Sequence, residues 1–160
     1  FSYVATANVV ELVGATPVFV DIDLTTFNID VSQIENKITP KTKILMLNSP
    51  SNPTGSIYSK DELLAIGEVL KGTDIVVLSD EMYEKLIYKG KKFTATAEVS
   101  PDMYNRTVTI NGLSKSVAMT GWRCCMSKQC TCKSYVKTSR ASYIKCKFYD
   151  SICSNCSFRR

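Results

Sequence analysis

The stretch KILMLNSPSNPTG, residues 43–55, joins an apolar run to a cluster of turn-forming residues. The apolar run is short and ends at turn residues, which favours a buried β-strand. A capping box, Ser59 with Glu62 three positions later, then predicts a helix that continues to about residue 70. A second apolar run, DIVVLSD at residues 74–80, follows that helix. A strand, a helix and another strand in this order predict a parallel pair.

The flanking sequence continues the same alternation in both directions. Gly14 follows an apolar pattern of helical spacing and is a helix C-terminal signal, Asp30 is an expected N-cap, and Ser100-Pro101 begins a turn. The further elements that we expect are helices at 4–13 and 31–38 and strands at 17–23 (PVFVDID) and 107–111 (TVTIN). The predicted fold class is α/β, with a mostly parallel sheet flanked by helices.

Polar residues gather at three of the predicted strand ends, namely residues 48–55, 79–83 and 111–116. Ligands of parallel sheets bind at the carboxyl ends of the strands, so these clusters form a candidate site. Each cluster also has an ordinary interpretation by itself. NPTG makes a good β-turn, Asp80 is suited to capping the next segment, and a pair such as Ser114-Lys115 is typical of solvated surface. The order and spacing of the clusters together indicate a function.

Four motifs taken together resemble the class I/II aminotransferases of fold type I, and most closely the prokaryotic-type aspartate aminotransferase branch. They are NSPSNPTG (48–55), LSDEMYE (78–84), NGLSKS (111–116) and MTGWR (119–123). The resemblance covers essentially all of residues 1–123. It implies part of the large domain of a pyridoxal-phosphate-dependent transferase. The implied activity moves an amino group between an amino acid, aspartate or similar, and a 2-oxo acid.

The resemblance assigns the chemistry to three residues. Lys115 is expected to bind pyridoxal 5'-phosphate covalently and to move the proton at the substrate α-carbon. Asp80 is expected to pair with the pyridine nitrogen of the cofactor and to keep that nitrogen protonated, which makes the ring an electron sink. Tyr83 is expected to hydrogen-bond the 3-oxygen of the ring.

The resemblance assigns four more residues to cofactor binding. Asn52 shares the 3-oxygen with Tyr83, and Arg123 binds the phosphate with its planar fork. Ser114 is a further candidate for a phosphate contact. Tyr3 falls where the family places an aromatic ring stacked on the cofactor. No residue is assigned to a metal.

The last 37 residues have a different composition from the rest of the chain. All seven cysteines lie within residues 124–160, together with eight Lys/Arg and one acidic residue, and this stretch has no Gly, Pro or Leu. A metal site at Cys130, Cys132, Cys153 and Cys156 and a basic nucleic-acid-binding tail are both conceivable interpretations. We favour a frameshift. The cysteine codons TGT and TGC, read one base later, specify only valine or alanine, so a shift of one base would convert all seven cysteines into these two residues. We therefore expect residues 1–123 to be a partial cofactor-binding domain and residues 124–160 to be an out-of-frame tail without a native fold.

The remaining expectations concern partners and location. Residues 1–123 hold 12 basic and 14 acidic residues and no cysteine, which argues against a nucleic-acid partner and suits a reducing cytoplasm. No run of eighteen apolar residues is present, so we expect no membrane span. The chain opens at Phe1 in mid-pattern and is expected to be an internal fragment, inactive alone, of a homodimeric enzyme. A lyase or decarboxylase with the same cofactor site, or a non-catalytic regulator of the same fold, stays open.

Overall fold

A four-stranded sheet forms the centre of the computed structural model, which describes residues 3–88, 90–122 and 125–127. Its strand order is β1-β2-β3-β4. Strands β1 (Ile44–Asn48), β2 (Val76–Asp80) and β3 (Thr107–Gly112) pair in parallel, and β4 (Cys125–Ser127) pairs antiparallel with β3. The predicted α/β class with a mostly parallel sheet is confirmed.

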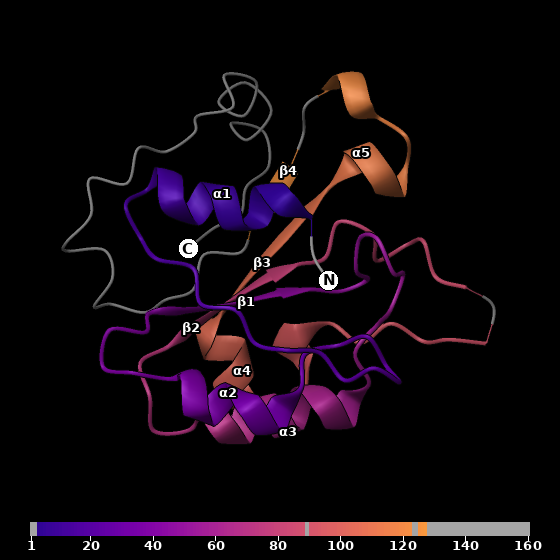
Figure 1. The fold of residues 1–160 in the computed structure, drawn as a ribbon. Coiled ribbons are helices and arrows are strands. Elements are labelled where there is room, and N and C mark those ends of the chain that lie inside the picture. Colours follow the sequence, from indigo (N-terminus) through magenta and orange to yellow (C-terminus); the bar gives the residue numbers. More distant parts are fainter. Residues whose placement is uncertain (1–2, 89, 123–124, 128–160) are drawn as a thin grey trace.

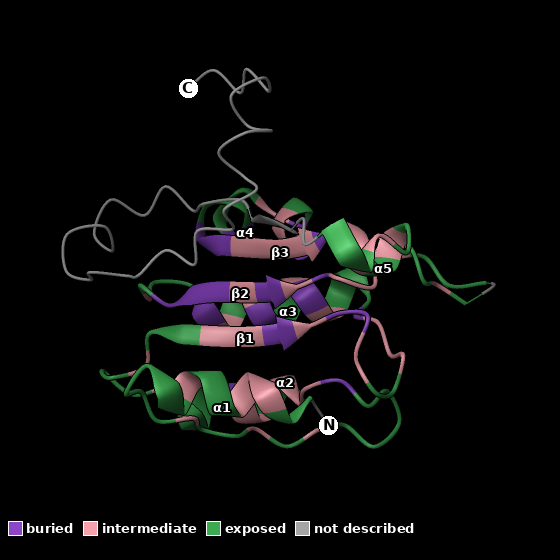
Figure 2. Ribbon diagram, turned by 90° about the horizontal axis from the view of Figure 1, so that it is seen from above, coloured by how far each residue is buried: buried purple, intermediate pink, exposed green. Residues whose placement is uncertain are grey.

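The helices cover the two faces of the sheet unequally (Figures 1 and 2). Helices α3 (Lys60–Leu70) and α4 (Pro101–Arg106) lie under one face, and α2 (Val31–Lys37) packs beside α3. Helix α1 (Val4–Leu12) lies on the other side, beyond the β1 edge, and none of its residues is buried. Two short helical segments, η1 (Thr96–Glu98) and η2 (Thr120–Trp122), and helix α5 (Leu113–Ser116) complete the described elements.

The hydrophobic core lies between α3 and the face of the sheet that it covers. Leu63, Ile66 and Leu70 repeat at helical spacing along α3, and all three are fully buried. They belong to one cluster with Leu47 of β1 and Val77 of β2. Burying a side chain of this size stabilises a fold by about 1.5–3 kcal/mol. The helix-covered face therefore carries most of the apolar stabilisation of the described residues.

Two predicted helix starts are confirmed at the level of individual hydrogen bonds. The Ser59 hydroxyl accepts from the backbone N–H of Glu62, and the Glu62 carboxylate accepts from the backbone N–H of Ser59 at 2.7 Å. Asp30 caps α2 by accepting from the backbone N–H of Ser32 at 3.0 Å. These contacts satisfy N–H groups that have no partner within a helix.

The predicted strand at residues 17–23 is wrong. Among the described residues, this region forms one isolated bridge, between Ile22 and Ile29. Asp23 then bends the chain, because its carboxylate accepts from the backbone N–H groups of Thr25 and Thr26 at 2.7 and 3.0 Å. Phe19 is 73% exposed, because no strand of the described part of the chain lies beside this apolar run. An apolar run forms a strand only where a partner strand can satisfy its backbone groups.

Strand β4 lies within residues 124–160, and the expectation that this tail is out of frame and without a native fold stays a prediction. Residues 125–127 pair with Ile110, Asn111 and Gly112 of β3. Antiparallel pairing uses backbone groups, which every non-proline residue carries, so it does not depend on the identity of the side chains. Residues 128–160 lie outside the described part of the chain. Within that part, no helix is long and apolar enough to cross a membrane.

Thr107 at the start of β3 offers a test of the core. Its side chain is fully buried, and its hydroxyl has no hydrogen-bond partner among the described residues. Replacing it with the similarly shaped valine removes an unpaired polar group, which costs about 1–3 kcal/mol when buried. We expect Thr107→Val to raise the free energy of unfolding by about 1 kcal/mol in urea titrations.

The matched control is Thr73→Val. The Thr73 hydroxyl donates to the backbone oxygen of Leu70 at 2.7 Å, so this substitution should lower the free energy of unfolding by about 1 kcal/mol. Equal effects of the two substitutions would contradict the assignment of Thr107 as an unpaired group.

Candidate functional site

The carboxyl ends of the three parallel strands meet at one edge of the sheet. Asn48 of β1 is paired in register with Asp80 of β2, and Asp80 with Ile110 of β3. Helix α5 follows β3 directly and lies at the end toward which the strands run (Figure 2). The three polar clusters predicted from the sequence therefore lie together.

The Asp80 side chain lies on the face of the sheet opposite α3. Side chains alternate along a strand, and Val77 and Ser79 of β2 are fully buried on the α3 side, which directs Asp80 to the other face. Its carboxylate accepts from the backbone N–H of Met82 at 3.2 Å. Burial raises the pKa of the Asp80 carboxyl, and the hydrogen bond from Met82 opposes that rise. The carboxyl is thus half-buried, with capacity for a further donor.

Asn48 joins the first two clusters, a role that sequence reasoning did not assign to it although it lies in the first cluster. Its amide nitrogen donates to the backbone oxygen of Asp80 at 3.2 Å, and its side-chain oxygen accepts from the backbone N–H of Asn52 at 2.8 Å. The backbone N–H of Ser49 also donates to the oxygen of Asp80, at 3.0 Å. One side chain therefore fixes the position of Asn52 relative to Asp80. The available signal was an asparagine as the last residue of a predicted strand.

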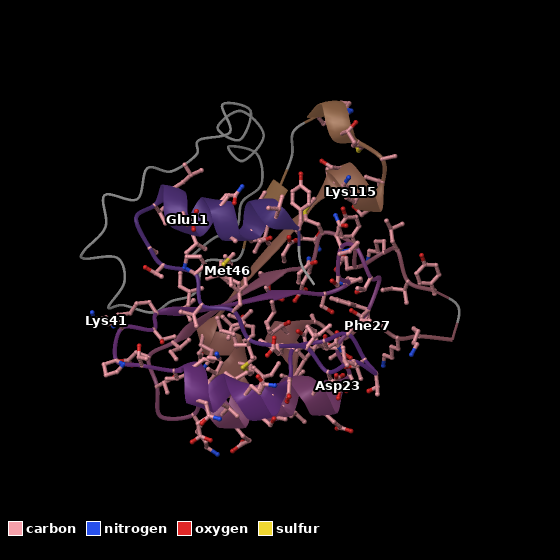
Figure 3. The ribbon with its side chains drawn as sticks, viewed as in Figure 1. Glu11, Asp23, Phe27, Lys41, Met46 and Lys115 are labelled. Atoms are coloured by element: carbon pink, nitrogen blue, oxygen red, sulfur yellow. The ribbon has the colours of Figure 1, made fainter. Side chains whose placement is uncertain are left out.

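Tyr83 connects the second cluster to the other two. The Asn52 amide nitrogen lies 3.5 Å from the Tyr83 hydroxyl oxygen. The Lys115 Nζ lies 5.7 Å from the centre of the Tyr83 ring, which is within range of a cation–π interaction. Lys115 itself is exposed on α5, and Figure 3 shows it on the upper side of the sheet. The structure thus brings together Asn52, Asp80, Tyr83 and Lys115.

The other three predicted residues are not joined to this group by a described contact. Tyr3 is 61% exposed and lies at the start of α1. Ser114 is half-buried in α5, one residue before Lys115. Arg123 lies outside the described residues, so its placement stays a prediction.

The group of four residues fits the chemistry that pyridoxal phosphate requires. A half-buried carboxyl with a free acceptor position suits a pyridine N–H, as Asp80 supplies. The Asn52 amide and the Tyr83 phenol lie close together, and both can donate a hydrogen bond, which suits the 3-oxygen of the ring. The primary amine of Lys115 suits a carbonyl carbon. For metals the finding is different: no group of three or more Cys, Asp or Glu residues in the described part could hold an ion. Cys130, Cys132, Cys153 and Cys156 lie outside it.

Comparisons with known proteins agree on one family. The family model described as aminotransferase class I and II matches residues 1–151. The aspartate aminotransferase of Geobacillus stearothermophilus is 50% identical over 115 residues, which are 71% of this chain and 29% of that protein. A probable aspartate/prephenate aminotransferase of Rhizobium leguminosarum bv. phaseoli is 47% identical over 123 residues, which are 76% of this chain and 31% of that protein.

The crystal structure of the aspartate aminotransferase from Rhizobium meliloti has a similar fold. The TM-score is 0.75 at 37% sequence identity, and the match covers 79% of this chain and 32% of that one. The chain therefore spans about a third of the length of the relatives that it matches.

The raised pKa of Asp80 predicts a pH-dependent cost in stability. Between the ordinary aspartate pKa and the raised one, the folded chain binds more protons than the unfolded chain, so stability falls as pH rises through this window. Below the ordinary pKa both states are protonated and the cost vanishes. We expect Asp80→Asn to gain stability relative to the parent at pH 7 and to lose that gain at pH 3, in urea titrations.

Asp23 is a control of opposite sign. A hydrogen bond from the Thr25 hydroxyl, with two backbone donors, lowers the pKa of the Asp23 carboxyl. Its stabilisation is present above the ordinary pKa and is lost as pH falls through the lowered one. Asp23→Asn should therefore be less stable than the parent at pH 7, with a smaller difference at pH 3. The same pH trend in both variants would contradict the burial of Asp80.

Proposed function

The chain belongs to the class I and II aminotransferases, and from this membership and the geometry of the site we propose that it is part of a pyridoxal-phosphate-dependent transaminase. The enzyme moves an amino group between an amino acid, aspartate or similar, and a 2-oxo acid. The observation that carries the proposal is the convergence of Asn52, Asp80, Tyr83 and Lys115 at one sheet edge.

Asp80 performs the electronic part of the proposed reaction. When bound, pyridoxal phosphate supplies a protonated ring that accepts the electron pair left on the substrate α-carbon. The Asp80 carboxylate holds the proton on the ring nitrogen by charge. Burial raises the pKa of this carboxyl and so disfavours its charged form until a cation or a hydrogen-bond donor binds beside it.

Lys115 performs the proton transfer. Its amine would hold the carbonyl carbon of the cofactor and, when free, would take and return the proton at the α-carbon of the substrate. Tyr83 lies between Lys115 and Asn52, so it can orient both the amine and the 3-oxygen of the ring. Support for this assignment is geometric and comes from the described contacts.

The phosphate and stacking contacts rest on the family resemblance. We propose that Arg123 binds the phosphate bidentately, that Ser114 adds a hydrogen bond, and that Tyr3 stacks on the ring. The position of Ser114 beside Lys115 on α5 supports its assignment. The N-terminal position of Tyr3, exposed at 61%, leaves its ring accessible to a ligand.

The assembly and location of the intact enzyme are also proposals. We propose a homodimer, from the resemblance, and a cytoplasmic location, which the absence of cysteine from residues 1–123 supports. Because the chain spans about a third of its relatives, we propose that it has no transaminase activity by itself.

We propose further that residues 124–160 are translated out of frame. Their composition supports this, and the pairwise matches reported above cover 115 and 123 residues. The family model runs on to residue 151, which an in-frame tail would explain directly. The nucleotide sequence decides between the two.

We expect the full-length enzyme that carries these residues to bind pyridoxal phosphate through Lys115. Borohydride reduction followed by peptide mass mapping should place the label on the peptide that contains Lys115. The Lys115→Ala variant should give no label, and the parent should convert aspartate and 2-oxoglutarate into oxaloacetate and glutamate. A label on another lysine would reject the assignment, and labelling without turnover would favour a lyase, decarboxylase or regulator.

We expect the gene to show a small insertion or deletion just after the codon for Arg123. Sequencing of independent genomic clones across this codon is the measurement. Restoring the frame should replace the cysteines by valine or alanine. An uninterrupted reading frame in every clone would overturn the proposal.

A further inference from the structure

Glu81, the residue after Asp80, has a buried carboxylate that the proposed reaction does not use. The residue is 2% exposed. Its Oε1 accepts from the Ser79 hydroxyl at 2.9 Å and from the backbone N–H of Thr96 at 3.0 Å. The hydroxyls of Ser79 and Thr96 are also 2.8 Å apart, and both residues are buried. The three residues form one closed polar cluster under the sheet.

This cluster closes the loop that carries Tyr83. The chain leaves β2 at Asp80 and returns to the sheet at η1, where Thr96 lies. Glu81 holds both ends of this loop, since its side chain contacts Thr96 and its backbone N–H donates to the oxygen of Ile110 in β3 at 2.9 Å. Asp80 and Tyr83 lie on either side of Glu81 in the sequence, so its position limits the positions of both.

Alternation across the strand end directs the two neighbouring carboxylates to opposite faces. Ser79 and Glu81 are on the side of α3, and Asp80 is on the open side with Asn48. The hydrogen bonds of Glu81 can therefore fix the Asp80 backbone, and the Glu81 side chain does not compete for the ligand of Asp80. The backbone oxygen of Asp80 is fixed in addition by Asn48 and Ser49.

We propose that Glu81 is a positioning residue, which holds Asp80 and Tyr83 in the relative geometry that the cofactor site needs. The inference rests on the proposed function for its purpose and on the hydrogen bonds above for its mechanism. If position 81 served stability alone, an apolar side chain would serve it better than a carboxylate, because a buried carboxylate carries a desolvation cost. Burial does raise the pKa of the Glu81 carboxyl, nearby Glu84 raises it slightly further, and three hydrogen bonds oppose the rise.

The test uses the 160-residue chain without cofactor, so its outcome does not depend on whether Lys115 is labelled in the full-length enzyme. The readouts are the titration of the Asp80 carboxyl by carbon-13 NMR and the hydrogen exchange of the Met82 amide, which donates to Asp80. The variants are Glu81→Ala, which removes the acceptor, and Glu81→Gln, which keeps an oxygen in its place. Ile66→Val, a small loss in the fully buried core of α3, is the control for general destabilisation.

We expect Glu81→Ala to lower the pKa of Asp80 toward its ordinary value, because water reaches the carboxyl once the loop is released. The Met82 amide should exchange faster by on the order of tenfold. Glu81→Gln and Ile66→Val should leave both readouts close to those of the parent. If Glu81→Ala does not fold, Ser79→Ala removes the hydroxyl that donates to Glu81 and should shift both readouts in the same direction.

Three results would each overturn the proposal. The first is an Asp80 titration and a Met82 exchange rate that Glu81→Ala, or Ser79→Ala in its place, leaves unchanged. The second is an equal shift in Ile66→Val, which would make the effect one of global stability. The third is a shift in Glu81→Gln as large as that in Glu81→Ala, which would remove the oxygen acceptor as the cause.

Discussion

The parallel register of β1, β2 and β3 is the constraint on which the rest of the structure depends. Hydrogen bonding that sets Asn48 beside Asp80, and Asp80 beside Ile110, ends the three strands at one edge. Residues that are 32 positions apart in the sequence then become neighbours, as the contact from Asn48 to Asp80 demonstrates. A slip of one residue in β2 would direct Asp80 into the core and Ser79 to the open face, because side chains alternate along a strand. The apolar contacts of Leu47 and Val77 with α3 hold the register against such a slip.

One face of the sheet carries the hydrophobic core, and the opposite face carries the Asp80 side chain of the candidate site. The face covered by α3 and α4 contains the buried cluster, while on the other face Ile44 is 47% exposed and Met46 and Leu78 are only partly buried. The Asp80 side chain is directed to this second face by the alternation along β2, and Figure 3 shows Lys115 above the sheet. A ligand can therefore bind there without disturbing the core. The same division explains why α1, on the open side, has no buried residue although it is rich in valine.

Local signals predicted most of the described fold, whereas the roles of the site residues come from the family resemblance and stay predictions. The capping residues Ser59 and Asp30 act within three residues of their own position, so the sequence contains the whole interaction. The strand expected at 17–23 failed because strand formation depends on a partner elsewhere in the chain, and an apolar pattern does not reveal whether one is present. Asn48 and Glu81 lie in the predicted clusters but received no role from the sequence, for a related reason. Their partners, Asp80 and Thr96, lie 32 and 15 residues away, and no periodicity marks a side chain that bonds to distant backbone.

The adjacent carboxylates of Asp80 and Glu81 at the end of β2 have different hydrogen-bond partners, which suits them to different roles. Both carboxyls have raised pKa values because both are partly removed from water, yet their surroundings differ. Glu81 accepts from Ser79 and Thr96, and these partners are all within the fold. Asp80 accepts from the Met82 amide and keeps capacity for one donor more, on the side where Lys115 lies. A fold that satisfied Asp80 as fully as Glu81 would be more stable but would leave no acceptor for a ligand. The unequal hydrogen bonding of the two neighbouring acids therefore supports the proposed roles, in which Asp80 binds a ligand and Glu81 positions Asp80.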